Sequence, residues 1–203
     1  MTTILQLNTS IYSAGGQSSK LATQFVDALH EREPAAKVIV RDLASDPVPH
    51  LDASRFGAFL AKPAERTAEQ QAVVDYSDTL ISELRRADVI VLGLPMYNFG
   101  VPSTLKAYFD HVARAGKTFK YTEKGPVGLL TGKKAVVFAT RGGLYAGTPL
   151  DTQTGYVRDF LAFLGITDVE FVYAEGLAIG EASKTASLAK ARESLHNLVP
   201  AIA

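Results

Sequence analysis

The sequence contains no cysteine and no tryptophan among its 203 residues. The absence of cysteine excludes disulfides, thiolate metal sites, iron–sulfur clusters and a cysteine nucleophile. An excess of charge of one sign is also absent, because 21 basic and 21 acidic residues give a formal net charge of zero. Without a run of lysine and arginine there is no electrostatic basis for binding nucleic acid or an anionic membrane.

Long hydrophobic runs are absent as well. No apolar stretch reaches the roughly 18 residues needed to span a bilayer, and the N-terminal MTTILQLNTS lacks the basic segment of an export signal. We therefore expect a cytoplasmic protein without a membrane span. No repeat, low-complexity tract or linker divides the chain, so we expect a single domain over residues 1–203.

Several motifs that would specify other chemistries are missing. No G-x-G-x-x-G occurs, which disfavours a Rossmann dinucleotide turn, and GLLTGKKA (128–135) has neither the glycine spacing nor the Ser/Thr of a P-loop. No G-x-S-x-G follows any strand-like run, which disfavours a serine hydrolase. We expect no metal site, because the histidines show no ligand spacing: His30, His50, His111 and His196.

Strand-like and helical patterns alternate along the whole chain. The strand-like runs are 3–8, 37–43, 88–94, 134–140 and 169–174. The helical patterns lie near 18–32, 67–86, 102–115, 152–164 and 181–197. This alternation predicts an α/β fold with a parallel sheet and helices on both faces.

The character of each run predicts its place in the sheet. The runs 88–94 and 134–140 are continuously apolar, as interior strands must be, whereas Lys37, Arg41 and Glu170 mark two runs as edge strands. Numbered along the chain, the five strands then take the order 2-1-3-4-5, which is that of flavodoxin-like folds.

Two regions outside the predicted sheet have simple interpretations. Segment 44–66 contains three prolines and is predicted to be an irregular excursion available to a partner subunit. On the helix after Pro102, Asp110 and Arg114 are four residues apart and are predicted to form a solvated ion pair, with His111 on the polar face.

Three unusual loops follow predicted strands one, three and four. In the order 2-1-3-4-5 the carboxyl ends of strands one and three open a crevice, because their connections leave in opposite directions. The loops predicted to converge there are NTSIYSAGGQSS (8–19), PMYNFG (95–100) and TRGG (140–143).

The first loop has the features of a phosphate site. It offers five serine and threonine hydroxyls, and Gly15 and Gly16 precede a predicted helix that begins near Gln17–Ser18. A helix N-terminus provides unpaired N–H groups and a favourable dipole for an anion. The alternative is an ordinary glycine turn with Ser18 as the N-cap.

The second and third loops have the features of a site for a planar ring. Met96, Tyr97 and Phe99 offer polarizable surface, and Asn98 can hydrogen-bond along a ring edge. The glycines of TRGG allow backbone amides to approach a ring carbonyl. The alternatives are a hydrophobic plug over the sheet and a plain turn. Taken together, the three loops predict flavin mononucleotide (FMN).

The residues that form these loops also carry a family resemblance. PMYNFGVPSTLKAYFDHVARAGKTFKYTEKGPVGLLTGKKAVVFATRGG resembles the FMN-dependent NADH:azoreductase and NAD(P)H:quinone oxidoreductase family, which is flavodoxin-like and homodimeric. The similarity extends over nearly the whole chain, including RDLA (41–44) and GITDVEFVYAEG (165–176). The loop LYAGTPLD (144–151) departs from the family pattern, which leaves the substrate preference open.

The resemblance implies specific roles for residues of this chain. It implies that FMN contacts the following set: Ser10, Gly16, Gln17, Ser18, Met96, Tyr97, Asn98, Phe99, Thr140, Arg141, Gly142 and Gly143. It implies that Tyr121 and Phe163 wall the substrate side of the flavin, partly across a dimer interface. Phe163 also belongs to a helical stripe with Tyr156 and Phe160, a pattern that is more often core.

The activity implied by the resemblance is a ping-pong transfer of electrons. NADH or NADPH would reduce the flavin, and a quinone or azo compound would then accept the electrons, with no protein group required as a catalytic acid. The amides of Gly142 and Gly143 would stabilise negative charge on the reduced ring. The alternative function is a flavodoxin-type electron carrier, although the zero net charge argues against the acidic surface of such carriers.

Overall fold

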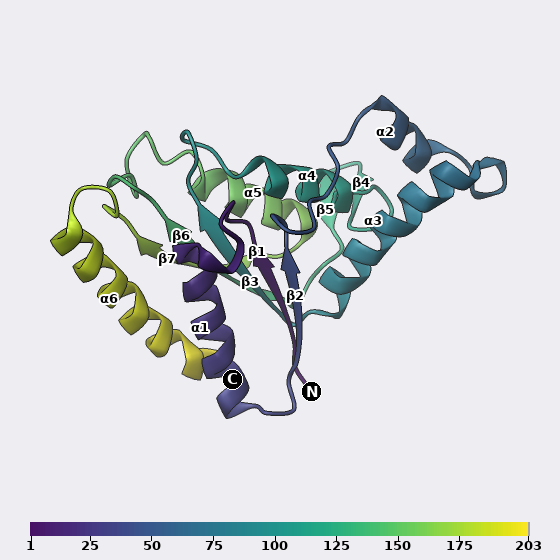
Figure 1. Ribbon diagram of the computed structural model, residues 1–203. Coiled ribbons are helices and arrows are strands. Elements are labelled where there is room, and N and C mark those ends of the chain that lie inside the picture. Colours follow the sequence, from purple (N-terminus) through teal and green to yellow (C-terminus); the bar gives the residue numbers. More distant parts are fainter. Residues whose placement is uncertain (203) are drawn as a thin grey trace.

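The central feature of the computed structural model, which describes residues 1–202, is a five-stranded parallel sheet (Figure 1). Its strands are β1 (Thr3–Asn8), β2 (Lys37–Asp42), β3 (Val89–Pro95), β6 (Lys134–Thr140) and β7 (Asp168–Ala174). Their order is β2-β1-β3-β6-β7, with every pair parallel. This confirms the predicted flavodoxin-like order, since β6 and β7 are the fourth and fifth strands of this sheet.

Burial along each strand follows its place in the sheet. Every residue of β3 is buried, as the continuous apolar run predicts, whereas β2 and β7 lie at the two edges and include exposed positions. On interior strands successive side chains point to opposite faces, so that Leu5 and Leu7 enter one core and Ile4 enters the other. The apolar patterning therefore distinguishes the interior strands from the edge strands.

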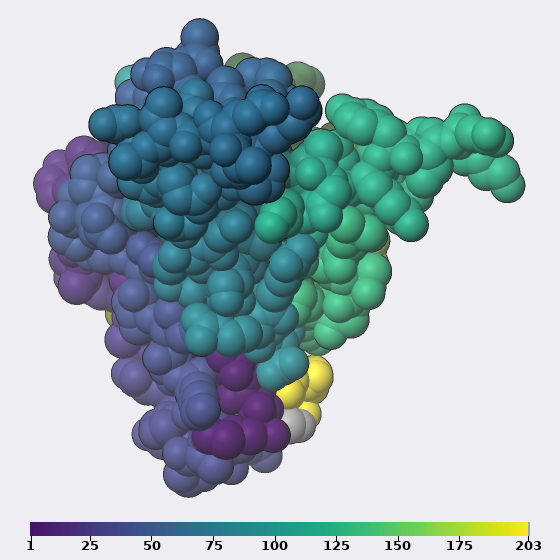
Figure 2. Space-filling model, turned by 90° about the vertical axis from the view of Figure 1, so that its right-hand side faces the viewer, coloured from purple at the N-terminus to yellow at the C-terminus, as the bar shows by residue number. Residues whose placement is uncertain are grey.

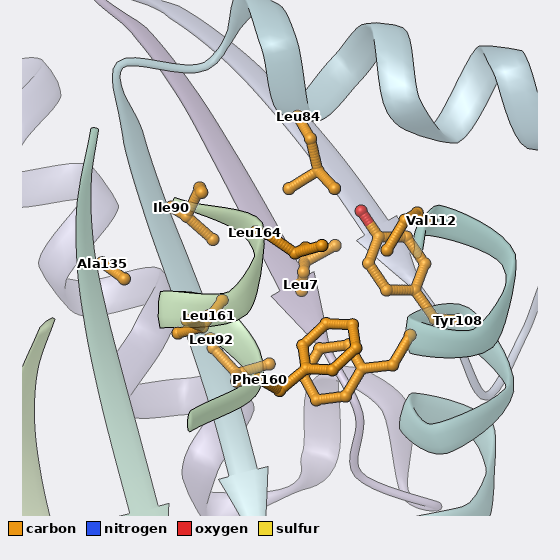
Figure 3. A pocket seen from close by; sticks show the side chains of 11 residues that line it. Leu7, Leu84, Ile90, Leu92, Tyr108, Val112, Ala135, Phe160, Leu161 and Leu164 are labelled. Carbon is orange, nitrogen blue, oxygen red and sulfur yellow. The ribbon is translucent and has the colours of Figure 1, made fainter. Parts of the chain in front are cut away.

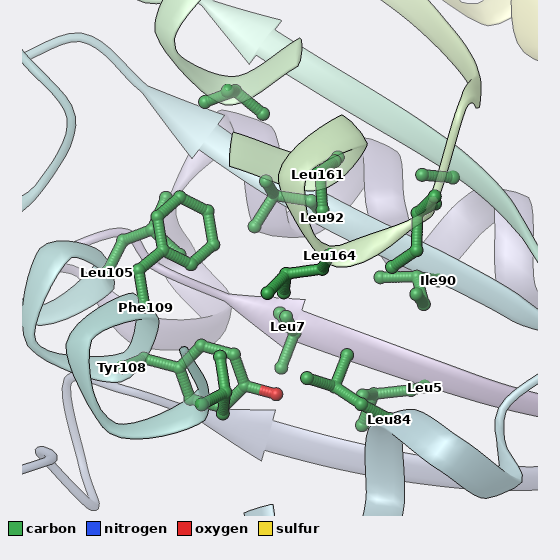
Figure 4. Close-up of a cluster of buried hydrophobic side chains, with 14 of the residues drawn as sticks. Leu5, Leu7, Leu84, Ile90, Leu92, Leu105, Tyr108, Phe109, Leu161 and Leu164 are labelled. Carbon is green, nitrogen blue, oxygen red and sulfur yellow. The ribbon is translucent and has the colours of Figure 1, made fainter. Parts of the chain in front are cut away.

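Helices cover both faces of the sheet (Figure 1). They are α1 (Gln17–Arg32), α2 (Ala53–Leu60), α3 (Ala68–Arg86), α4 (Ser103–Val112), α5 (Thr154–Leu164) and α6 (Glu181–Leu198). Helices α1 and α6 pack on one face, and α3, α4 and α5 supply the larger core on the other, part of which is shown in Figure 4. None of the helices in residues 1–202 combines the length and apolarity that crossing a membrane requires.

The larger core contains a small void beneath Tyr108 (Figure 3). Its volume is about 10 Å³, which is close to the minimum for one water molecule and far too small for a cofactor. The hydroxyl of Tyr108 points toward Leu84 and has no hydrogen-bond partner within the described chain. Burial raises the pKa of this hydroxyl well above its ordinary value.

Two predictions about the helix after Pro102 are wrong, because helix α2 packs beside it. His111 is buried, not on a polar face, because its ring lies edge-on to Phe59 of α2 and Tyr76 of α3. Burial lowers its pKa below the ordinary histidine value. The predicted Asp110–Arg114 pair is also wrong, because Arg114 is buried over Phe59 and bonds Asp78 at 2.7 Å. Segment 44–66 is therefore not irregular throughout, because it contains a helix that packs on α3 and reaches His111 of α4 through Phe59.

A β-hairpin occurs where the sequence predicts only a loop. Strands β4 (Phe119–Thr122) and β5 (Gly125–Gly128) pair antiparallel, and the hairpin stands out from the body of the molecule as the green arm in Figure 2. Its base packs against the end of α5, where a Cβ on Gly128 would lie 2.0 Å from the backbone nitrogen of Gly165. Only glycine at residue 128 allows the arm to dock this closely.

Candidate functional site

The loops after β1 and β3 meet at the side chain of Tyr97. Its hydroxyl lies 3.3 Å from Oγ of Ser10 and accepts a hydrogen bond from the Ile11 N–H at 3.2 Å. The loop after β6 joins them, because the Met96 N–H donates to the Thr140 carbonyl at 2.9 Å. The three loops therefore converge at the carboxyl ends of β1, β3 and β6, as predicted for the reversal point of the sheet.

The N-terminus of α1 has the properties of an anion site. Gly16, not Ser18, is the N-cap, and no side chain of the described residues caps the first turn. The hydroxyls of Ser18 and Ser19 are buried and have no hydrogen-bond partner in residues 1–202. Buried hydroxyls are rarely left unpaired, so these two at a helix N-terminus indicate an acceptor supplied by a ligand.

Gly16 allows the first loop to close over this helix end. A Cβ at residue 16 would lie 2.2 Å from Oγ of Ser10, a distance that no side chain tolerates. Ser10 Oγ in turn accepts a hydrogen bond from the Tyr12 N–H at 3.2 Å. Ser10 and Gly16 thus form one cradle with Ser18, and this cradle fits the phosphate of FMN.

The loop 95–100 contains a strained two-residue turn. Asn98 and Phe99 have φ angles of 50° and 61°, in the left-handed region. Tyr97 and Gly100 on either side exchange backbone hydrogen bonds at 3.2 and 2.9 Å. A bulky residue such as phenylalanine is a real outlier at positive φ, and such outliers cluster at ligand sites. The turn leaves both side chains exposed, and that of Asn98 makes no hydrogen bond within the described chain.

The loop 140–143 turns its carbonyls inward and its amides outward. The carbonyls of Gly142 and Gly143 accept hydrogen bonds from Ala178 and Gly176 at 3.0 and 2.9 Å. Neither glycine N–H has an acceptor among residues 1–202. Thr140 itself is buried. Two adjacent free donors at this position fit the carbonyl edge of a flavin ring.

Arg141 points away from the other loop residues into the protein. Its fully buried guanidinium bonds Asp151 at 2.7 Å and Glu175 at 3.1 Å. Burial alone would raise the pKa of Asp151, but hydrogen bonds from Arg141 and Thr154 outweigh it, so this pKa lies below the ordinary value. The Arg141 side chain therefore holds the loop in place and presents no charge to the site.

Tyr145 lies between the second and third loops. Its ring meets the Phe99 ring edge-on at 5.5 Å between centroids. Its hydroxyl occupies the space beside Gly143, where a Cβ would be 2.6 Å away. The loop 144–151 thus places an aromatic residue beside the predicted ring site.

The two predicted substrate-side residues lie on the hairpin and α5, not on the three loops. Tyr121 is on β4 and is 75% exposed. Phe163 is on α5 and half-buried. Both pack on Phe119, with ring centroids at 5.4 and 4.3 Å. Tyr156 and Phe160 of the same stripe instead pack on Phe109 in the core.

Two supporting residues were not predicted from the sequence. Gly93, inside β3, lets the start of α1 approach, because a Cβ there would lie 3.1 Å from the Ser18 backbone. Its carbonyl also accepts a hydrogen bond from Thr9 at 2.7 Å. An isolated glycine within an apolar strand is a signal of close backbone approach, so Gly93 was detectable. The second residue is Gln153, whose side chain donates to the carbonyls of Pro95 and Gly100. Its sequence context gives no signal of this role, because it lies in a polar loop.

Comparisons with known proteins identify the family of this chain. A family model described as "Flavodoxin-like fold" matches residues 2–199. An FMN-dependent NADH:quinone oxidoreductase of Burkholderia lata is 57% identical, over 96% of this chain and 98% of its own. One of Cellvibrio japonicus is 55% identical, over 94% and 96%.

Solved structures show the same similarity at lower sequence identity. An azoreductase from Bacillus anthracis superposes with a TM-score of 0.89 at 29% identity, covering 98% of this chain and 99% of its own. An FMN-dependent NADH-azoreductase from the same species, in complex with FMN, gives 0.87 at 28%, covering 98% and 100%. With near-complete coverage in both comparisons, the chain belongs to the flavodoxin-like family of FMN-dependent NADH:quinone oxidoreductases and azoreductases.

Proposed function

We propose that this protein is an FMN-dependent oxidoreductase that takes electrons from NADH and passes them to quinones and azo compounds. The observation that carries the proposal is the pair of buried hydroxyls at the start of α1 that have no hydrogen-bond partner in residues 1–202, beside two loops whose donors also lack acceptors there. Relatives that cover nearly the whole chain, at 55–57% identity, are NADH:quinone oxidoreductases by name. The azoreductase activity has weaker support, from structural neighbours at 28–29% identity.

Each loop has a distinct task in holding the cofactor. Gly16, Gln17 and Ser18 would bind the phosphate with the N–H groups of the first turn and the Ser18 hydroxyl, and Ser10 closes the cradle. Residues 96–99 would hold one side of the ring system, and residues 140–143 its carbonyl edge. When bound, FMN supplies transfer of a hydride from NADH and of electrons to the acceptor in a ping-pong cycle.

The chain contributes electrostatics through backbone dipoles. The free amides of Gly142 and Gly143 would donate to the pyrimidine end of the ring, where reduction places negative charge. Arg141 cannot serve this purpose with its side chain, because Asp151 and Glu175 already pair with it. The site therefore stabilises the added electrons with neutral donors that need no rearrangement.

We also propose a homodimer in which the hairpin arm reaches the partner's site. The arm exposes large apolar side chains, with Tyr121 at 75%, Val127 at 44% and Leu129 at 39%. Clustered exposed apolar surface of this kind marks interaction sites. The dimer would bring Tyr121 on the arm, and Phe163 on α5 at the base of the arm, toward the substrate side of the partner's flavin. We place the enzyme in the cytoplasm, where NADH is available.

Anaerobic mixing with NADH tests the activity directly. We expect the yellow absorbance of the purified protein to bleach at once, and to return when a small quinone or the azo dye methyl red is added. Splitting one azo bond into two amines should consume two molecules of NADH, because each delivers two electrons. A flavodoxin-type carrier would instead stay yellow with NADH, and that result would overturn the proposal.

The Asn98 side chain is expected to act mainly on flavin reduction. In Asn98→Ala the loss of one ring-edge hydrogen bond, about 1–1.5 kcal/mol, should slow reduction by NADH about tenfold, with FMN occupancy only modestly reduced. Stopped-flow absorbance measures the rate. Asn98→Gly is the control for backbone strain, because glycine accepts the φ of 50° without cost. Wild-type rates in both variants would remove Asn98 from the site.

A further inference from the structure

Gln153 connects both ends of the loop that carries the strained turn. It immediately precedes α5 and is completely buried. Its Nε2 donates to the carbonyls of Pro95 and Gly100, each at 2.9 Å. One amide group thus ties together the points where the chain leaves β3 and where it ends the turn.

The neighbouring residue supports the turn itself. The Thr152 hydroxyl donates a hydrogen bond to the Phe99 carbonyl. Phe99 has a φ of 61°, a conformation that persists only where the surroundings determine it. Residues 152 and 153 therefore hold three carbonyls of the loop 95–100, including that of the strained phenylalanine.

The same segment is anchored to the other ring-binding loop. Asp151 bonds Arg141 of the loop 140–143 at 2.7 Å. Thr154 bonds both the Arg141 guanidinium, at 3.1 Å, and the Tyr173 hydroxyl, at 2.9 Å. Residues 151–154 consequently fix the two loops relative to each other, although none of them is in the predicted site.

We propose that Gln153 is a positioning residue that holds the Tyr97–Gly100 turn in place against the flavin ring. Thr152 supports the same turn through its hydrogen bond to the Phe99 carbonyl. The inference rests on the proposed placement of the ring at residues 96–99. Gln153 touches neither cofactor nor substrate and acts through the backbone of the turn. A displacement of the turn by about 1 Å is enough to lower the rate of reaction by up to about 100-fold.

Gln153→Met tests this role, because methionine has similar length and lacks the donors. At saturating FMN we expect the visible circular dichroism spectrum of the bound flavin to change. Single-turnover reduction by NADH should be about tenfold slower. Titration of the apoprotein should show an FMN affinity about tenfold weaker. Leu161→Met is the matched control at another buried position of the same region. It should change the melting temperature alone.

Thr152→Val and Thr152→Ser form a second pair at an exposed position, so folding is not at stake. We expect Thr152→Val to alter the flavin circular dichroism and the reduction rate in the same direction as Gln153→Met, and Thr152→Ser to restore both. The inference is overturned if Gln153→Met keeps the wild-type flavin spectrum, FMN affinity and reduction rate. If Gln153→Met does not fold, the same result in Thr152→Val overturns it.

The proposed ring placement fails in a different way. If Asn98→Ala and Ser18→Asp also leave FMN binding and reduction unchanged, the flavin does not occupy the three loops. If those two variants act and the Gln153 and Thr152 variants do not, only the positioning role is wrong. Altered flavin spectra in Gln153→Met and Thr152→Val, with wild-type spectra in Thr152→Ser and Leu161→Met, support the inference.

Discussion

Ser18→Asp should yield a folded, colourless protein. Ser18 is buried in the first turn of α1, where its hydroxyl has no partner among the described residues. An aspartate carboxylate there would accept hydrogen bonds from the first-turn N–H groups and interact favourably with the helix dipole, so the helix itself is not weakened. The same carboxylate would occupy the donors that the phosphate needs and would repel its charge.

The size of the effect follows from Coulomb's law. Two like charges about 4 Å apart near a protein surface repel by roughly 4 kcal/mol, which is about a 1,000-fold loss of affinity. Flavin fluorescence quenching on titration of the apoprotein measures the dissociation constant, and the ratio of visible to ultraviolet absorbance gives the occupancy after purification. Ser18→Ala, which only removes the hydroxyl, should cost about tenfold.

Ser82→Asp is the matched control for the added charge, because Ser82 is exposed on α3. It should purify yellow with wild-type FMN affinity. Stoichiometric FMN in Ser18→Asp would show that the phosphate lies elsewhere. That outcome would show that the N-terminus of α1 does not bind the cofactor, and it would not bear on the fold.

The sheet and the meeting of the three loops were predictable because they depend on local patterns. Continuous apolar runs place β3 and β6 in the interior, and charges such as Lys37 place β2 at an edge. Once the order is fixed, the geometry of a parallel sheet brings the three loops together. The unusual composition of those loops, with Gly16 and the Met96–Phe99 stretch, then indicates the kind of ligand.

The features that were not predicted depend on contacts distant in sequence. His111 was expected on a polar face because the segment that covers it, α2, has a proline-rich context that is typical of irregular structure. Arg114 likewise finds Asp78 on α3, 36 residues away, in place of the nearby Asp110. Gln153 has two carbonyl partners more than fifty residues away. Residue type and spacing along the chain do not predict such pairings.

Arg141→Met should destabilise the protein more than any of the other substitutions. The Arg141 side chain is fully buried, and its partners Asp151 and Glu175 have side chains only 8% and 14% exposed. Removing one member of a buried ion pair costs about 3–5 kcal/mol, because the remaining charges have no partner. Methionine fills most of the space, so the loss arises from charge and not from a cavity.

The loss should depend on pH in a defined direction. In the wild-type protein the pKa of Asp151 is lowered, so its ion pair contributes stability above the ordinary carboxyl pKa of about 4, and this contribution is lost as the pH falls through the lowered value. Removing Arg141 takes away its hydrogen bond and its charge, which leaves the hydrogen bonds from Thr154 to oppose burial, so we expect the pKa of Asp151 to rise. The folded variant then binds a proton at Asp151 more readily than the folded wild-type protein does. Its loss of unfolding free energy relative to the wild-type protein is therefore greatest at pH 7 and becomes smaller toward pH 5.

Urea unfolding of the apoproteins at pH 7 and pH 5 measures both effects. Adding Asp151→Asn and Glu175→Gln to Arg141→Met should recover much of the loss, because replacing a whole buried ion network by neutral groups is often nearly neutral. A pH-independent deficit below about 1 kcal/mol would show that the network behaves like an exposed ion pair. The loop 140–143 would then owe its position to the hydrogen bonds of Gly142 and Gly143 with residues 176–178.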